Sequence, residues 1–279
     1  MHDIYQREYG LKDIFSKSWS LFRDNFWNIA LVTCFIYFPL SVVINFFSDV
    51  ITSRLPNTNN MFDEGVRFNA IYYLAGVYNF VFGTIGVMAI TFLVKFRLDG
   101  QPVEIKGFLK KVIVKWLSAL ITLLMTISFI MIIGVMFMSL IGGVRQLTNN
   151  PLIFNLFLYP IAAVFVLICF IYCRVVLYVI PLCDKFGLEA LRHSLALIKG
   201  RWLRSGAYIL VFCSIYPIFF LVLFCITFPL IAKVGNAGGF FSLGADILIN
   251  ICNSFIIVLS AVFFINFSAI NPRNITPRE

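Results

Sequence analysis

Six long apolar stretches alternate with polar connections along the chain. A helix needs about 20 largely apolar residues to cross the hydrocarbon core of a bilayer, and each stretch reaches that length. Their interiors are almost free of charged residues, with Arg174 as the exception. The pattern predicts six transmembrane helices, over residues 27–48, 71–94, 116–141, 152–180, 207–232 and 247–270.

A second pattern, of helical period 3.6, marks three of the polar connections: residues 11–22, 103–116 and 187–202. Apolar side chains fall on one face of each and mostly charged ones on the other, as in a helix that lies in the membrane surface. In the third segment, His193 falls on the polar face, where we expect it to be solvated, and the apolar face includes Leu188 and Leu195. The predicted fold class is an all-α membrane protein with six transmembrane helices and three amphipathic interfacial helices on the cytoplasmic side.

Lysine and arginine are divided unevenly between the two sides of this predicted bundle. The segments on the side of the N-terminus hold 17 of them, and the opposite side holds four. Because basic residues mark the cytoplasmic face, the sequence predicts a multi-pass protein of the cytoplasmic (inner) membrane with both termini in the cytoplasm. The polar first 26 residues do not resemble a cleavable signal peptide, so we expect the first membrane helix to direct insertion.

The chain contains no long soluble segment, so residues 1–279 are predicted to form a single membrane domain. Surface helix, outward span and inward span follow one another three times, which indicates repeats over 11–94, 103–180 and 187–270 and a pseudo-threefold axis along the membrane normal. A displacement of 176 residues aligns the first and third copies, pairing Asp13 with Glu189, Ser18 with Ser194 and Leu21 with Leu197. The second copy shares only the pattern. The alternative is that any six-span chain with basic inner connections looks periodic.

The composition agrees with a membrane location and argues against an enzyme. Hydrophobic residues make up 61% of the chain and charged residues 13%, against about a quarter charged in soluble domains. Only two histidines are present, and no phosphate-binding, metalloprotease, nucleophile-elbow or dinucleotide motif occurs. We therefore expect no enzymatic activity, no cofactor, no metal site and no binding to nucleic acid. The seven cysteines lie mostly in apolar runs, where packing is the expected role even for Cys169 and Cys173, which share a helix face.

The basic residues of the inner connections are the most specific candidate site. Each lysine or arginine near an anionic leaflet contributes about 1 kcal/mol of attraction, so a cationic amphipathic helix gains several kcal/mol. The alternative is that these charges only set the topology, which accounts for their number but not for their amphipathic spacing. The candidate lipid-headgroup residues are Lys106, Lys110, Lys111, Lys115, Arg192, Lys199, Arg201 and Arg204.

A smaller set of polar or helix-breaking residues lies within the predicted spans. Arg174 is about two turns before Pro181, close enough to the interface for its side chain to reach it. Asn250 and Asn253 share a face of the last span, which suits either hydrogen bonding between helices or a polar ligand path. Pro217 and Pro229 both fall in the fifth span, where they indicate either a static kink or a moving, ligand-lining helix.

One segment resembles a known family. The run from Pro181 to Trp202, PLCDKFGLEALRHSLALIKGRW, is similar to an element of the YciC-like proteins and of the membrane domain attached to some glycerophosphodiester phosphodiesterases. Residues 11–27 resemble its N-terminal counterpart. The resemblance implies a multi-helix membrane domain loosely associated with lipids and the envelope. It carries over no catalytic residue, since the enzymes of the family hydrolyse their substrate in a separate soluble domain.

These observations lead to three hypotheses about function. The first is a non-enzymatic membrane protein that engages anionic lipids, in lipid handling or as an assembly platform. The second is a transporter or exporter component for a lipid or other hydrophobic substrate, in which the fifth span borders a cavity. The third is an immunity or accessory subunit of an ABC-type exporter. Membrane lipids with anionic headgroups are the expected partners, with a protein partner or a homo-oligomer left open.

Overall fold

The computed structural model describes residues 9–54, 61–101, 105–148, 159–199, 201–234 and 238–269, and these ranges contain helices and no strand. The predicted all-α class is confirmed for them. The helices are α1 (Leu11–Asp24), α2 (Phe26–Arg54), α3 (Met61–Leu98), α4 (Ile105–Thr148), α6 (Tyr159–Cys183), α7 (Gly187–Ile198), α8 (Trp202–Val234) and α9 (Gly238–Ala269). Each of the six apolar stretches lies within one long helix as far as the structure describes it, with residues 152–158 of the fourth stretch outside the described residues.

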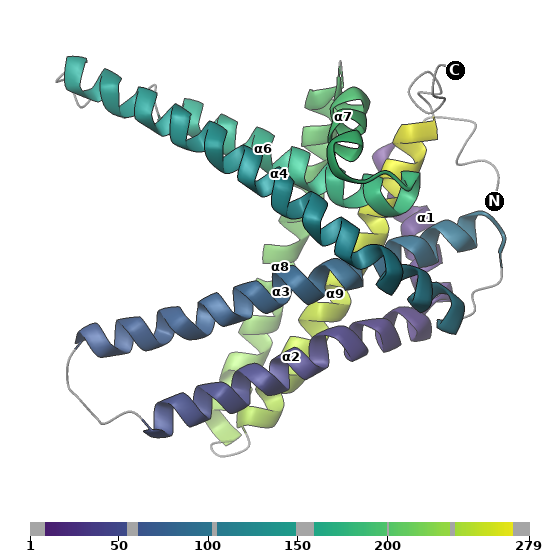
Figure 1. The fold of residues 1–279 in the computed structure, drawn as a ribbon. Helices are drawn as coiled ribbons and strands as arrows, with labels where there is room; N and C mark the ends of the chain where they lie inside the picture. Colours follow the sequence, from purple (N-terminus) through teal and green to yellow (C-terminus); the bar gives the residue numbers. More distant parts are fainter. Residues whose placement is uncertain are drawn as a thin grey trace.

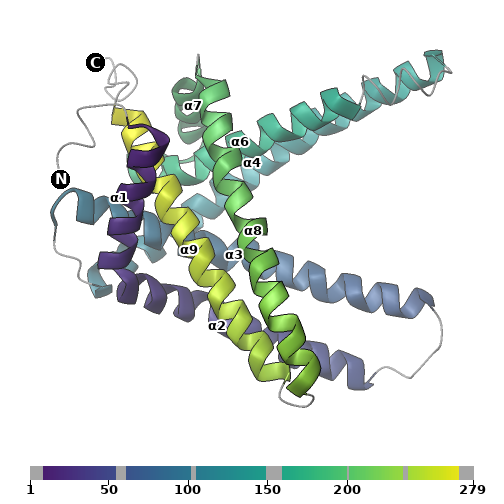
Figure 2. The same ribbon diagram turned by 180° about the vertical axis from the view of Figure 1, so that it is seen from behind.

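The long helices pair into three hairpins, α2 with α3, α4 with α6, and α8 with α9, that radiate from a common base (Figure 1). The view from behind shows that the free ends of the hairpins point in different directions (Figure 2). We call the common base the basal end. It contains the first turns of α2, α4 and α8, the last turns of α3, α6 and α9, and the two short helices α1 and α7.

Three helices in the described ranges are long and apolar enough to cross a membrane: Gly76–Leu98, Leu109–Met136 and Ile247–Ser268. A fourth span results if α7 and α8, which meet at 102°, are taken as one broken span. The described apolar parts of α2 and α6 are shorter, over Phe26–Pro39 and Ile171–Cys183. Several apolar helices can therefore span a bilayer, while the predicted number of six is not confirmed.

The core lies at the basal end, among the three helices that return to it. α3, α6 and α9 contact one another, and their inward-facing side chains are fully enclosed, as shown by Ile90, Val175 and Val258. The outward helices α2, α4 and α8 pack on the outside of this group. A single contiguous hydrophobic cluster runs through all of these elements.

Helix α1 docks on the core largely as its sequence pattern predicts. Ile14, Ser18 and Phe22, all on the predicted apolar face, are buried against the core, together with Leu21. Edge contacts of the Trp19 and Phe22 rings with Phe255, and a tilted contact of Phe15 with the same ring, hold the helix on α9. Tyr9 N donates to Asn266 Oδ1 at 3.0 Å, so the two described ends of the chain lie side by side.

The predicted apolar face of α7 was assigned to the membrane surface, and only part of it, with Ile198, packs on the core. The residues buried against the core are Ala190, His193, Ser194, Leu197 and Ile198, whereas Leu188 is 61% exposed and Leu195 50% exposed. His193, expected to be solvated, is only 6% exposed. Small residues let helices approach closely, so the burial of Ala190 and Ser194 suits the contacts of α7 with α6 and α4, and Leu188 and Leu195 stay on the exposed side.

The displacement of 176 residues matches helix boundaries as well as residue types. α1 and α7 begin at Leu11 and Gly187, and α2 and α8 begin at Phe26 and Trp202, so both pairs are 176 residues apart. Each buried position of α1 has a buried counterpart in α7. Trp19 and Leu195, also 176 apart, are both exposed.

The second predicted surface helix, 103–116, is not a separate element. From Ile105 onward it forms the first turns of α4, which runs unbroken to Thr148. The reason is local: no glycine, proline or asparagine occurs between 108 and 133. In contrast, Asn25 leaves the helical region between α1 and α2, with φ −119° and ψ 17°, and Lys199 leaves it after α7, with ψ 122°.

Candidate functional site

The basal end carries an exposed set of positive charges. Lys110 and Lys111 on the first turns of α4, Arg192 on α7 and Lys199 after it are all exposed. We call these four residues the basal cations. The Nζ of Lys111 also lies 5.1 Å from the ring centroid of Phe96, which leaves its other sides open to solvent or headgroups.

The other predicted headgroup residues have partners within the protein. Lys115 Nζ forms an ion pair with Asp184, the Arg201 guanidinium lies 5.7 Å over the Phe267 ring, and Arg204 lies 5.6 Å over the Tyr208 ring. These three side chains are half-buried, so they hold the basal end together as well as adding to its charge. The side chain of Lys106 lies outside the described residues.

Three of the four tryptophans lie near the basal end: Trp19 in α1, Trp27 at the start of α2 and Trp202 at the start of α8. Trp27 is 81% exposed and Trp19 57% exposed, and tryptophan favours the boundary between membrane and water. Trp116 lies deeper, because its Nε1 donates to the Val81 carbonyl at 2.9 Å and to Thr84 Oγ1 at 3.1 Å, well before the end of α3. The signal in the sequence was a tryptophan close to the start of the first and fifth apolar stretches.

Hydrogen bonds tie the helices of the basal end together. Lys95 Nζ donates to the Leu182 carbonyl at 2.6 Å, where it satisfies one of the last carbonyls of α6 and suits the negative end of that helix. The backbone takes a left-handed conformation at Gly187, with φ +59°, to turn from α6 into α7. The Gly187 N–H donates to Thr122 Oγ1 at 2.8 Å, so the start of α7 is fixed to α4.

Burial and a neighbouring charge both act on the histidine of α7. Burial lowers the pKa of His193, and the nearby positive charge of Lys185 lowers that pKa further, while Glu189 opposes the shift. Lys185 Nζ lies 3.4 Å from His193 Nδ1 and 3.4 Å from Glu189 Oε1. Lys185 thus links the buried imidazole to the exposed carboxylate.

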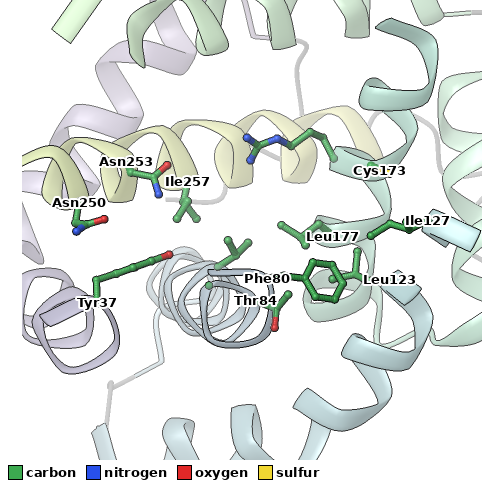
Figure 3. A pocket seen from close by; sticks show the side chains of 13 residues that line it. Tyr37, Phe80, Thr84, Leu123, Ile127, Cys173, Leu177, Asn250, Asn253 and Ile257 are labelled. Atoms are coloured by element: carbon green, nitrogen blue, oxygen red, sulfur yellow. The ribbon is translucent and has the colours of Figure 1, made fainter. Parts of the chain in front are cut away.

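A cavity of about 500 Å³ lies between α2, α3, α4, α6 and α9 (Figure 3). It is beyond the most tightly packed part of the core, on the side away from the basal end. Apolar side chains form most of its wall, and a tyrosine, a threonine, a cysteine, an arginine and two asparagines are set into it. The lining residues are Tyr37, Phe80, Gly83, Thr84, Val87, Leu123, Ile127, Cys173, Arg174, Leu177, Asn250, Asn253 and Ile257.

This cavity brings together three residues that the sequence singled out separately. Arg174, Asn250 and Asn253 all line it, so Arg174 faces the interior of the assembly. The two prolines of the fifth span do not join them: α8 is one continuous helix through both positions, and no lining residue comes from it. Pro217 is exposed, and the side chain of Pro229 lies outside the described residues. The described residues of the fifth span therefore do not line this cavity, and the expectation that the fifth span borders a cavity stays a prediction.

Comparison of the chain with protein-family models, curated proteins and solved structures gives no match. The resemblance to the YciC-like family therefore stays a prediction. Within the described ranges, no three His, Cys, Asp or Glu side chains are grouped so that they could hold a metal ion. The features of the described residues that bear on function are the basal cations, the tryptophans around them and the cavity.

Proposed function

We propose that this chain is a non-enzymatic multi-pass protein of the cytoplasmic membrane that engages anionic lipid headgroups at its basal end, in lipid handling or as an assembly platform. One observation carries the proposal. The basal cations lie on the same end of the molecule as exposed apolar side chains, among them Trp19, Trp27 and Leu195. A surface that is cationic and apolar at one level suits the boundary of an anionic leaflet.

In this proposal all six long helices cross the bilayer, and both termini are cytoplasmic. Support comes from the hairpins, because each leaves the basal end and returns to it. The basic connections therefore share one end of the molecule, as the distribution of lysine and arginine requires. The 102° bend between α7 and α8 suits a helix in the membrane surface that leads into a span.

The proposal includes a pseudo-threefold arrangement of three units. Its support is a cyclic pattern of contacts: α1 packs on α9, the first part of α4 on α3, and α7 on α6. Each surface segment thus rests on the returning helix of the unit before it, and the three returning helices meet at the centre. Parallel repeats about an axis along the membrane normal are a known plan of membrane proteins.

The interaction energy follows from the number of charges. At about 1 kcal/mol for each lysine or arginine near the leaflet, the four basal cations contribute roughly 4 kcal/mol of preference for an anionic over a neutral surface. The exposed tryptophan and leucine side chains add attraction that does not depend on lipid charge. The charges and the apolar side chains therefore both orient the protein in the membrane, and the charges alone set its preference for anionic headgroups.

The test compares two fourfold glutamine variants. In the first, Lys110, Lys111, Arg192 and Lys199 become Gln; in the control, Arg54, Arg67, Arg145 and Lys233 become Gln, which removes the same charge from the predicted outer side. Native mass spectrometry measures how much phosphatidylglycerol, relative to phosphatidylcholine, each protein retains. Loss of phosphatidylglycerol in the first variant but not in the control supports the proposal, and equal retention by both variants and the unchanged protein contradicts it.

A further inference from the structure

The central cavity has two chemically different sides. Figure 3 shows Tyr37, Asn250 and Asn253 gathered on one side, with the tyrosine hydroxyl directed inward. Phe80, Leu123, Ile127 and Leu177 lie on the other side, which is mostly apolar and also includes Thr84. A ligand that satisfies both walls must itself have a polar end and an apolar body.

The polar end of such a ligand is set by the charge of the wall. Of the lining residues, Arg174 carries a permanent positive charge and none carries a carboxylate. Arg174 is nine residues before the end of α6 at Cys183, about 14 Å along the helix axis, which is well inside the apolar layer of the proposed membrane. Ionisable side chains at such depth are costly and mark functional sites.

A guanidinium group is suited to one class of ligand group. Its planar N–H donors match the two oxygens of a carboxylate or phosphate, and these charge-assisted bonds are stronger than neutral ones. Asparagine amides and a tyrosine hydroxyl add neutral donors around the same group. Tyr37 and Arg174 both line the cavity, from α2 and α6, so a headgroup inside it can contact both.

The position of Tyr37 depends on a close approach to α3. A Cβ built on Gly86 would lie 3.0 Å from the Tyr37 hydroxyl and 3.3 Å from two ring carbons, whereas one on Gly83 would lie 3.8 Å from the hydroxyl. A side chain at 86 would therefore require the Tyr37 ring to shift by a few tenths of an ångström. Glycine at 86 lets the ring pack against α3 and line the cavity.

We infer that the central cavity binds an amphipathic organic anion, with its carboxylate or phosphate held by Arg174, Asn250, Asn253 and Tyr37 and its apolar part against α3 and α4. A cavity of about 500 Å³ falls in the range of about 300–1,000 Å³ that encloses small-molecule ligands. It suits a single-chain amphiphile. The site lies outside the proposed headgroup surface and shares no residue with the basal cations, so the two can fail independently.

The experiment uses dansylundecanoate, a fluorescent single-chain carboxylate, with the full chain in neutral detergent micelles. The expected result is saturable binding that oleate displaces and oleyl alcohol, which has the same chain without the charge, does not. Arg174→Gln should weaken binding by about 10- to 100-fold, the range for loss of a hydrogen bond to a charged group. Arg174→Lys keeps the charge but lacks the planar pair of N–H donors, so its affinity should fall between those of the unchanged protein and Arg174→Gln. Equal displacement by oleate and oleyl alcohol would overturn the inference.

A pair of leucine variants tests the cavity without touching a polar group. Gly83 lines the cavity, so Gly83→Leu fills it and should abolish binding. The matched control is Gly76→Leu, two turns earlier on α3, where an added Cβ meets nothing within 4 Å. Unchanged binding in Gly83→Leu would also overturn the inference, whatever happens to the stability of the Arg174 variants.

Two further arms identify the source of the anion and separate this site from the basal end. Displacement by lysophosphatidylglycerol as well as oleate assigns the site to phosphate and carboxylate amphiphiles, and displacement by oleate alone restricts it to carboxylates. The fourfold basal variant should bind dansylundecanoate like the unchanged protein. If that variant loses the probe while Arg174→Gln keeps it, the anion site belongs to the basal end and the cavity assignment is wrong.

Discussion

The orientation of α7 can be tested with two leucines that lie two residues apart on it. Leu197 is 3% exposed within the core, and Leu195 is 50% exposed on the opposite side. Replacing either by alanine removes the same atoms and changes helix propensity by the same small amount, so the difference between the two variants isolates burial. Leu197→Ala should cost about 2–5 kcal/mol, the range for buried leucines, whereas a surface substitution such as Leu195→Ala usually stays within about 0.5 kcal/mol.

The assay is thermal unfolding in dodecyl maltoside, followed with a dye that reacts with cysteines as the helices separate. At about 2–4 °C for each kcal/mol in a chain of this size class, Leu197→Ala lowers the midpoint by roughly 5–15 °C and Leu195→Ala leaves it almost unchanged. Leu21→Ala in α1, at the position 176 residues earlier, should behave like Leu197→Ala. A larger loss for Leu195→Ala would mean that α7 docks on the core through its Leu195 side, and equal small losses would mean that α7 does not dock.

Two further predictions concern the same assay. Gly83→Ala should raise the midpoint slightly, because alanine favours the helix by up to about 1 kcal/mol. Gly86→Ala should be less stable than Gly83→Ala by about 1–3 kcal/mol, because its methyl group crowds the Tyr37 ring. Equal midpoints for the two variants would refute the close approach of Tyr37 to α3. His193 has a lowered pKa in the folded protein, so below about pH 6.5 the unfolded chain binds more protons and stability falls as the pH falls through that window. His193→Gln should remove this part of the pH dependence, and an unchanged pH profile in the variant would show that His193 is solvated.

Local sequence patterns were sufficient to predict the helices but not the faces by which they pack. Six apolar stretches became long helices, and the buried face of α1 followed its apolar residues. In α7 the core packs against a side that includes the small residues Ala190 and Ser194, while Leu188 and Leu195 stay exposed, so the periodicity identified an amphipathic helix but not the side that docks. Hydrophobic periodicity measures side-chain area on a face, and helix packing also rewards small residues that let backbones approach.

Local sequence patterns were also insufficient to predict where the helices break and which residues meet in the cavity. Period 3.6 continues through residues 103–116 into the next span, and only the absence of a helix-breaking residue indicates that α4 is continuous there. Arg174 could be recognised as unusual within its own span. Its neighbours in the cavity, such as Tyr37 and Asn253, come from α2 and α9, and no local pattern predicts that those helices meet it.

The central claim is that the basal end faces the cytoplasm at the inner leaflet. The most direct measurement fuses a reporter pair, green fluorescent protein and alkaline phosphatase, after residue 279 and, separately, after Thr148 at the far end of α4. Green fluorescent protein fluoresces only in the cytoplasm, and alkaline phosphatase is active only outside it. The account predicts fluorescence for the fusion after 279 and phosphatase activity for the fusion after Thr148; the reverse pattern would contradict it.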